Sequence, residues 1–468
     1  MLFNSIEFLI FFPFVALLYF LSPHSKRWIV LLAASCYFYM AFVPVYILIL
    51  SFTILIDYFV GRYLEVVEGK RRKQLLVASL FANLGVLFAF KYFEFFSENV
   101  NLALQFIGLT QWIPTFKILL PIGLSFHTFQ SLSYIIEVYL GRQKAEKHLG
   151  YYALYVMFFP QLVAGPIERP QHLLHQLHEK HKPNLDRTIE GLKLIVWGFF
   201  KKIVVADRLA LFVDEIYGAP QSFSGAPLII ATYFFAFQIY CDFSGYSDIA
   251  IGSARILGID LMQNFRTPYF SKSIAEFWRR WHISLSTWFR DYLYIPLGGN
   301  RGSTFMWCRN LLIVFILSGI WHGANWTFAV WGLLHGMFLV CAVGSKRVLS
   351  RVRENLYVPS LPGFVKILIT FHIVLLSWIF FRANSISDAC YVLYHLFSPT
   401  IWGWHGVMGH YQMSTGFVLI ALLVFLEWIY DRDFLNKVVR RFWFLRLDFA
   451  YYALLLVIIL AGGVFDGS

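Results

Sequence analysis

The feature that most constrains this chain is a series of apolar runs, each close to the length of a membrane span. A helix needs roughly 20 apolar residues to cross the hydrocarbon layer, and fewer when its ends are amphipathic. Some runs contain Gly or Pro, which favours broken or re-entrant helices that line a cavity. We predict an all-α, polytopic membrane protein with about ten to twelve membrane-spanning helices plus re-entrant or interfacial helices. The runs are Ile6–Leu21, Trp28–Phe42, Tyr46–Val60, Leu75–Phe90, Ile118–Leu140, Tyr151–Ala164, Leu192–Val205, Leu228–Tyr240, Leu311–Ile320, Trp326–Val343, Val365–Phe381, Phe417–Ile429 and Ala450–Leu460.

Composition supports the membrane prediction. The 468 residues are 59% hydrophobic and only 14% charged, whereas soluble domains carry about 25% charged residues. The net charge of +12 comes from basic residues in short loops between apolar runs. This is the pattern of the positive-inside rule, so we predict contact with membrane lipids and no nucleic-acid partner. No long polar region interrupts the chain, and we therefore predict one membrane-embedded domain over residues 1–468.

The distribution of Lys and Arg also predicts an orientation. The loops Arg62–Lys73, Ser345–Arg353 and Asp431–Arg446 are rich in Lys and Arg, whereas Tyr92–Phe116 and Ala383–Met413 contain neither. Cytoplasmic loops carry the excess of basic residues. We therefore place the first three loops in the cytoplasm, and the last two loops and both ends of the chain outside it.

The stretch from Asp242 to Asn325 is the richest in polar residues that could take part in catalysis or binding. His322 lies there in SGIWHGANW, between two apolar runs, and Gly319 and Gly323 would allow close packing or close approach of a substrate. An imidazole titrates near neutrality and can act as a general base. The alternative is a packing histidine bonded to neighbouring helices, and the residues leave both interpretations open.

His282 is the second candidate and lies in WRRWHISLSTW. On one helix it would share a face with Trp278 and Arg279. This pattern is typical of an interfacial helix with aromatic and basic anchors. It also fits a cation-rich entrance for an anionic donor, formed by Arg279 and Arg280. Asp242 begins a polar stretch that could be a lining or a helix-start network.

The sequence predicts no metal site. The five cysteines show no paired spacing and no CxxC, so neither a zinc site nor a disulfide framework is indicated. The loop Pro296–Gly302 lacks the spacing of a Walker phosphate loop, and we expect it to be structural.

Five long segments resemble the membrane-bound O-acyltransferase family, and within it the bacterial branch that O-acetylates alginate. The resemblance extends from the N-terminus to about Ala383. The segments are LPIGLSFHTFQSLSYIIEVY (Leu120–Tyr139), FFPQLVAGPIERP (Phe158–Pro170), DFSGYSDIAIG (Asp242–Gly252), FWRRWHISLSTWFRDYLYIPLGGNRG (Phe277–Gly302) and SGIWHGANW (Ser318–Trp326).

The resemblance implies a ring of tilted helices around a transmembrane tunnel, with a catalytic core at about residues 118–343. It implies that His322 and His282 match the family's essential and second histidines. We regard both as catalytic candidates, with substrate-binding candidates at Asn325, Arg279, Arg280, Trp321 and Asp242. The D-alanyl transferase of teichoic acid is similar at both histidines, but PLGGNRG fits the polysaccharide branch better.

The function implied is acetyl transfer across a bacterial inner membrane. The donor would be cytoplasmic acetyl-CoA, with no further cofactor. The acceptor would be an exported polysaccharide such as alginate or cellulose, reached directly or through a periplasmic SGNH-type partner. The alternatives are a transporter that moves acetyl groups without catalysis, and an acyltransferase acting on peptidoglycan, teichoic acid or lipid.

Overall fold

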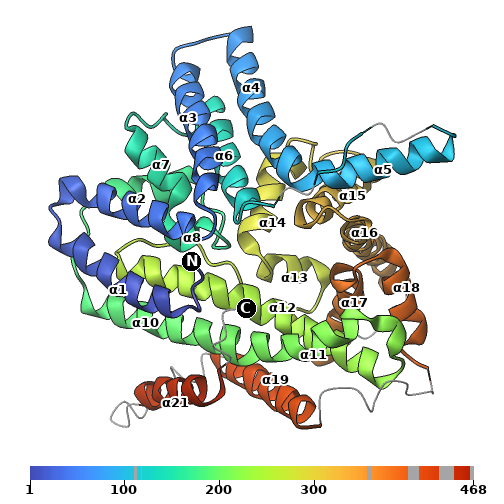
Figure 1. Ribbon diagram of the computed structural model, residues 1–468. Helices are drawn as coiled ribbons and strands as arrows, with labels where there is room; N and C mark the ends of the chain where they lie inside the picture. Colours follow the sequence, from blue (N-terminus) through green and yellow to red (C-terminus); the bar gives the residue numbers. More distant parts are fainter. Residues whose placement is uncertain (110–112, 117–118, 356–360, 399–409, 432–446, 464–468) are drawn as a thin grey trace. The chain divides into compact units, whose positions relative to one another are not determined.

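The structure is a computed structural model that describes residues 1–109, 113–116, 119–355, 361–398, 410–431 and 447–463 (Figure 1). These residues form helices and connecting segments, with no strand among them, which confirms the all-α prediction. Within the described ranges, six helices are long and apolar enough to cross a membrane: Pro44–Leu64, Lys70–Phe106, Ala226–Ile256, Thr304–His322, Trp326–Gly344 and Gly363–Arg382. Shorter apolar helices cover Ile6–Leu21, Met413–Trp428 and Tyr451–Leu460. A polytopic membrane protein is confirmed, while ten to twelve spans and a ring around a tunnel stay predictions.

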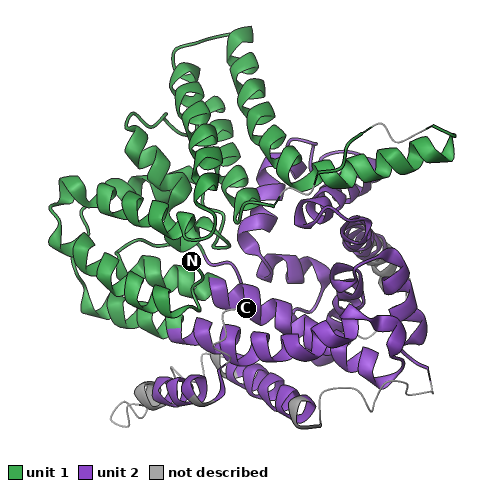
Figure 2. Ribbon diagram, viewed as in Figure 1, with its two compact units in different colours: residues 1–195, 247–262, 467 green, residues 196–246, 263–466, 468 purple. Residues whose placement is uncertain are grey.

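The chain divides into two compact units (Figure 2). Unit 1 contains residues 1–195 and 247–262, and unit 2 contains residues 196–246 and 263–466. Two helices, α10 and α12, contribute residues to both units. The prediction of a single domain stays a prediction.

Unit 1 consists mainly of the N-terminal helices. They are α1 (Ile6–Leu21), α2 (His24–Met40), η1 (Pro44–Tyr46), α3 (Ile47–Leu64), α4 (Lys70–Leu87), η2 (Phe88–Tyr92), α5 (Phe93–Phe106), α6 (Leu124–Tyr139), α7 (Leu149–Met157), α8 (Phe159–Leu162), α9 (Pro170–His178) and most of α10 (Leu185–Phe199).

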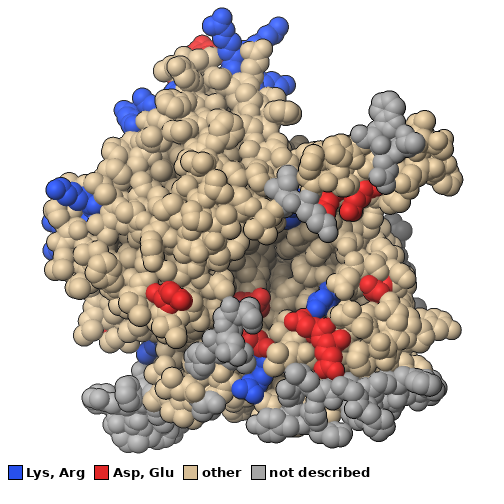
Figure 3. All heavy atoms as spheres, viewed as in Figure 1, with Lys and Arg blue, Asp and Glu red and all other residues tan. Residues whose placement is uncertain are grey.

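Helices α3 and α4 pack against each other and against α6. Lys and Arg side chains gather at the end of the α3–α4 pair, at the top of Figure 3, whereas the flanks of the pair are uncharged. This arrangement fits a cytoplasmic loop Arg62–Lys73 between two spans. The segment Tyr92–Phe116, predicted as a loop, is largely helical, because α4, η2 and α5 form one continuous run.

The predicted run Tyr151–Ala164 is broken, as its proline suggested. Helix α7 ends at Met157, and Phe158 leaves the helical region with φ −50° and ψ 109°. Pro160 then lies in the first turn of α8, where a missing N–H costs nothing. The break confirms that an apolar stretch with Pro need not form one straight span.

Unit 2 holds the C-terminal helices. They are η3 (Phe200–Ala206), α11 (Asp207–Gly218), η4 (Pro220–Ser222), most of α12 (Ala226–Ile256), η5 (Pro268–Phe270), α13 (Ile274–Arg280), α14 (Ile283–Phe289), η6 (Arg290–Tyr294), α15 (Thr304–His322), α16 (Trp326–Asn355), α17 (Gly363–Arg382), α18 (Ile386–His395), α19 (His410–Asp431) and α21 (Leu447–Gly462).

Two of the predicted cytoplasmic loops fall in unit 2. Ser345–Arg353 was predicted as a loop, and this is wrong: helix α16 continues through it to Asn355. Its residues are good helix formers apart from Ser and Val, so charge alone did not mark the end of the helix. The loop Asp431–Arg446 lies almost entirely outside the described residues.

The core of unit 2 is strongly aromatic. Trp278, Trp281, Trp331 and Trp378 are each 9% exposed or less and contact one another as rings, with centroid separations of 5.0–5.9 Å. Large rings bury much area with few rotatable bonds. This rigid core positions the short helices α13 and α14 against α15, α16 and α17.

Candidate active site

His282 occupies a break between two short helices. Helix α13 ends at Arg280, and His282 takes φ +42° and ψ 56° before α14 begins. The prediction that Trp278, Arg279 and His282 share the face of one helix was therefore wrong, because a left-handed residue turns the chain between α13 and α14. A side chain other than Gly in this conformation costs about 1–3 kcal/mol, and such residues cluster at functional sites.

The side chain of His282 is buried among aromatic rings. It is 1% exposed, and its ring centroid lies 4.6 Å from that of Phe243 and 6.2 Å from that of Trp321. Burial lowers the pKa of the His282 imidazole well below its usual range, and the nearby His322 adds to this effect. Burial therefore favours the neutral form of the His282 imidazole.

His322 ends the long helix α15 and comes close to His282. Their ring centroids are 6.5 Å apart. The His322 ring also contacts those of Trp321, Trp331 and Phe381, at centroid separations of 4.9, 5.1 and 5.2 Å. Two histidines that are distant in sequence thus share one aromatic compartment of unit 2.

Glycines let α15 and α16 approach closely enough to place His322. A Cβ on Gly319 would lie 2.2 Å from the Phe328 carbonyl oxygen, and one on Gly332 would lie 2.2 Å from the Phe315 carbonyl oxygen. Real Cβ contacts are never this short, so neither position accepts a side chain without movement. The predicted role of Gly319 in close helix packing is confirmed.

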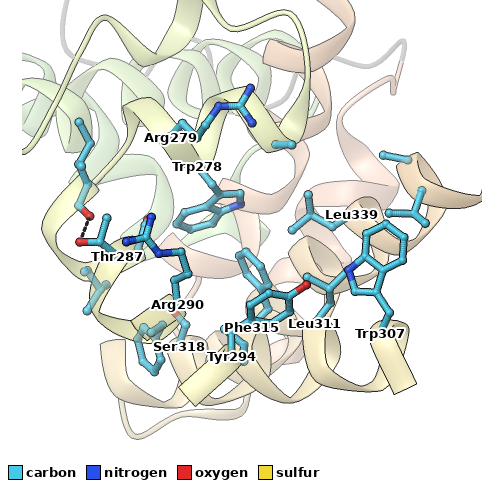
Figure 4. A pocket seen from close by; sticks show the side chains of 18 residues that line it. Trp278, Arg279, Thr287, Arg290, Tyr294, Trp307, Leu311, Phe315, Ser318 and Leu339 are labelled. Carbon is cyan, nitrogen blue, oxygen red and sulfur yellow. Dashed lines mark hydrogen bonds between the residues drawn. The ribbon is translucent and has the colours of Figure 1, made fainter. Parts of the chain in front are cut away.

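A cavity of about 770 Å³ lies beside this compartment, between α13, α14, η6, α15 and α16 (Figure 4). Ser318 lines it, and Ser318 is one helical turn before His322 on α15. Ile283, the neighbour of His282, lines it too. Its volume lies in the range of small-molecule sites. The cavity is therefore lined by residues close in the chain to both histidines, although neither histidine is part of its lining.

The cavity wall combines aromatic side chains with two arginines. Arg279 and Arg290 are exposed and line the cavity, and Figure 4 shows Arg290 beside Thr287 and Trp278. Trp278 is held by His335, whose Nδ1 accepts a hydrogen bond from the indole N–H at 3.3 Å. The other His335 nitrogen bonds the Ser377 hydroxyl at 2.9 Å. An apolar cavity with positive charge suits a ligand that has an apolar arm and an anionic end.

Sequence comparison connects this geometry to known proteins. Residues 146–381, about half of the chain and including both histidines, match the membrane-bound O-acyltransferase family. A probable alginate O-acetylase of Pseudomonas aeruginosa is 40% identical over 406 residues, which cover 86% of this chain and 76% of the relative. The chain belongs to the membrane-bound O-acyltransferase family. Its enzyme class is therefore the one predicted.

Other relatives of this membrane-bound O-acyltransferase act on different polymers. A peptidoglycan O-acetyltransferase of Helicobacter pylori is 36% identical over 395 residues, covering 79% of this chain and 73% of the relative. A teichoic acid D-alanyltransferase of Streptococcus thermophilus is 29% identical over 289 residues, covering 56% of this chain and 68% of the relative. The relatives thus share O-acylation of cell-envelope polymers, and their acceptors differ.

The structure places the remaining predicted site residues of the O-acyltransferase in three settings. Trp321 contacts the rings of both histidines, with centroid separations of 6.2 Å to His282 and 4.9 Å to His322. Asn325 supports the α15–α16 turn: its Oδ1 accepts from the Thr327 N–H at 3.0 Å, and its Nδ2 donates to the Asn384 carbonyl at 2.9 Å. Asp242, on α12, forms an ion pair with Lys202 at 2.6 Å.

Arg280 differs from its neighbour Arg279. It pairs with Glu276 at 2.9 Å and donates to the Thr267 hydroxyl at 3.2 Å. The ion pair lies within α13, whereas the bond to Thr267 joins α13 to the preceding loop. Arg280 is not part of the cavity lining. It stays a prediction that Arg280, Asn325 and Asp242 bind substrate. In the structure each of these side chains bonds to another group of the protein.

Arg290 and Tyr294 line the cavity, and the Asn264 side chain contacts His282 at 3.1 Å, although none of the three was a predicted site residue. The first two stand in the quoted motif WFRDYLY, where Arg after an aromatic run was the only available signal. Nothing in the sequence marks Asn264, because its contacts form only when separate segments of the chain come together. The loop Pro296–Gly302 is structural as expected: Asn310 donates to the Leu297 and Gly299 carbonyls at 3.1 and 3.0 Å. Among the described residues, no cluster of His, Cys, Asp or Glu fits a metal ion.

Proposed function

We propose that this membrane-bound O-acyltransferase transfers acetyl groups from cytoplasmic acetyl-CoA to a polysaccharide outside the cytoplasm. The observation that carries the proposal is the proximity of the His282 and His322 rings, 6.5 Å apart, beside a cavity with two arginines. A general base next to a site for an anionic thioester is the arrangement that acyl transfer requires.

His322 is the proposed general base. It takes the proton from an acceptor hydroxyl as the oxygen attacks the thioester carbonyl carbon. The new C–O bond forms, the C–S bond breaks, and the proton passes to the departing thiolate to give the free thiol. General-base assistance contributes about 10²–10⁴-fold. Fixing both reactants in one compartment that excludes water contributes further.

The cavity is the proposed donor site. Arg279 and Arg290 would attract the phosphates of coenzyme A, and the aromatic wall suits the uncharged arm that carries the thioester. Ser318, one helical turn before His322, and Ile283, next to His282, both line the cavity. A thioester bound beside them would lie close to His322.

The relatives support the proposed acceptor. Identity of 39–40% with probable alginate O-acetylases favours an exported polysaccharide such as alginate, and cellulose is an alternative acceptor of the same chemical class. A periplasmic SGNH-type partner would complete the transfer, with a serine as the intermediate acceptor. On this proposal the protein lies in a bacterial inner membrane, with its donor inside and its acceptor outside.

The proposal can be tested with purified protein in sealed vesicles whose cytoplasmic face points outward. Labelled acetyl-CoA is added outside, and an acceptor polysaccharide with an SGNH-type partner is enclosed within. We expect label on the enclosed polymer together with release of free coenzyme A in equal amount. Free labelled acetate in the lumen without polymer label would support a transporter instead. Faster transfer from palmitoyl-CoA or from a D-alanyl thioester would contradict the acetyl donor.

A further inference from the structure

Three hydrogen-bond donors converge on the side-chain oxygen of Asn264. The His282 Nδ1 lies 3.1 Å from Asn264 Oδ1, the Ser284 hydroxyl donates to it at 2.9 Å, and the Ser284 backbone N–H donates at 3.2 Å. All three residues are 1% exposed or less. Asn264 lies outside both segments that hold the predicted catalytic histidines, yet its amide touches one of them.

The Ser284 N–H decides which way the Asn264 amide faces. The oxygen and nitrogen of an Asn side chain are assigned from their hydrogen-bond partners. A backbone N–H is always a donor, so the atom opposite Ser284 N must be the oxygen. Reversing the amide would place its NH₂ group against that N–H. The His282 Nδ1 lies 3.1 Å from the same oxygen, and a hydrogen bond between these two atoms requires the hydrogen on Nδ1. The Ser284 hydroxyl is 3.5 Å from Nδ1 but only 2.9 Å from the Asn264 oxygen, to which it donates.

The neutral state of His282 then decides the chemistry of its other nitrogen. A neutral imidazole has one N–H and one lone pair. With the hydrogen on Nδ1, the lone pair is on Nε2, which is buried. His282 is therefore able to accept a hydrogen bond or a proton at Nε2, and unable to donate one there.

The backbone keeps Asn264 and His282 in register. The Ile283 N–H donates to the Asn264 carbonyl at 2.8 Å, and the Arg266 N–H donates to the Arg280 carbonyl at 2.9 Å. These bonds join the loop before α13 to the break after it. They also account for the left-handed backbone of His282, because a strained residue persists where its surroundings hold it.

We propose that Asn264 is a positioning residue that holds His282 as the Nδ1–H tautomer and presents the Nε2 lone pair to the reaction compartment. On the proposed function, this makes His282 an acceptor for an O–H or N–H of a substrate or for the ring N–H of His322. It does not polarise the thioester carbonyl, since that task needs a donor.

The tautomer is measured by nitrogen-15 NMR on protein with labelled histidine, without donor or acceptor present. The His282 signal is identified by its absence in His282→Gln. We expect a protonated Nδ1 and an unprotonated Nε2 in the native protein and in Ser284→Ala, which removes one donor and keeps the His282 contact. Asn264→Asp, which retains an oxygen acceptor, should keep this tautomer, and Asn264→Leu should lose it. A native His282 with its hydrogen on Nε2 overturns the inference.

Kinetics separate positioning from a merely structural effect. Asn264→Leu should lower kcat for acetyl transfer roughly tenfold or more, as loss of an orienting partner typically does, with KM for acetyl-CoA little changed. In the His282→Gln background the same substitution should have no further effect, because Asn264 acts through His282. An equal loss in both backgrounds shows that Asn264 only stabilises the fold, and the inference fails. If native protein transfers no acetyl group, the proposed function fails, whereas the NMR result still decides the tautomer.

Discussion

His282 and His322 come from different kinds of local structure. One lies in a left-handed break between two seven-residue helices, and the other ends a 19-residue helix. Their rings nevertheless share a compartment with Trp321. Each histidine is held by its own surroundings: His282 by Asn264, and His322 by the rings of Trp331 and Phe381. The positions of both histidine rings therefore depend on these neighbouring side chains.

Arg290 is expected to contribute to donor binding and not to the chemical step. Arg290→Ala should raise KM for acetyl-CoA about tenfold, equivalent to about 1.4 kcal/mol, because a phosphate loses one charged partner. The kcat should change little. The measurement is initial transfer rate against acetyl-CoA concentration, with Arg301→Ala as the control, since Arg301 is exposed and is not part of the cavity lining.

A donor without phosphates shows whether Arg290 acts on the phosphates of coenzyme A. Acetyl-pantetheine lacks the nucleotide phosphates, so Arg290→Ala should leave its KM unchanged. A similar rise for both donors, or a rise in Arg301→Ala as large as in Arg290→Ala, would mean that Arg290 does not contact the phosphates.

Residue types could be predicted from the sequence better than residue partners. His322, His282 and Arg279 stand out because polar groups are costly in an apolar chain. The partners of Arg280 could not be foreseen, because Thr267 reaches it only after the loop folds back. Asn264 is an ordinary residue in sequence, and only the three donors around its oxygen reveal it.

At the scale of elements, the contact of α15 with α16 positions His322. Gly319→Ala places a methyl group 2.2 Å from a carbonyl oxygen of α16. Overpacking of this kind costs about 1–3 kcal/mol, so the thermal midpoint in detergent should fall and transfer should slow. Gly344→Ala, which lies on α16, is the control, because no atom lies within 4 Å of its added methyl group. Equal midpoints for the two variants would contradict the close packing.

A buried polar cluster joins α3 to α4 in unit 1. Asp57 is fully buried and accepts hydrogen bonds from Ser79 at 2.5 Å and from the Asn83 amide at 2.9 and 3.0 Å. Helix pairs in membranes depend on such bonds and on close packing. This cluster therefore ties the two helices together at one defined position.

Asn83→Leu should destabilise unit 1. The Asp57 carboxyl group would lose one of its buried donors, at a cost of about 1–3 kcal/mol. The thermal midpoint measures this loss, and Gln74→Leu on the exposed side of α4 is the matched control. A midpoint that falls no further in Asn83→Leu than in Gln74→Leu would show that the cluster contributes little.

The elements were predicted from hydropathy with uneven success. The cores of α3, α15 and α17 were found because each is one apolar run. The full length of α16 was not predicted, because Lys and Arg are good helix formers and a basic segment can extend a helix beyond the membrane. The break at His282 was missed because no Gly or Pro marks it, and tertiary bonds to Asn264 impose it.

For the whole molecule, the prediction concerns orientation. The loop Arg62–Lys73 should face the cytoplasm, and the segment Ala383–Met413 should face outward. In a background without other cysteines, Glu68→Cys should react with an impermeant thiol reagent only from the cytoplasmic face. The exposed Cys390, retained alone, should react in intact cells. The reverse labelling pattern would show the opposite topology, in which the proposed donor site would not be reached from the cytoplasm.

The membrane class and the family could be predicted from composition and long motifs, and both are confirmed by the helices and the relatives. The division into two units could not be predicted, because α10 and α12 contribute to both and no linker marks a boundary. The relatives are named for different acceptors, namely alginate, peptidoglycan and teichoic acid.

The proposed role of His322 as general base is tested by comparing two glutamine variants. His322→Gln and His395→Gln are measured for acetyl transfer in sealed vesicles, with thermal midpoints confirming that both are folded. His395 lies on α18 and stacks on Tyr391. We predict a loss of about 10²–10⁴-fold for His322→Gln and near-native transfer for His395→Gln. Near-native transfer by a folded His322→Gln protein would show that His322 only packs, and the mechanism would be wrong.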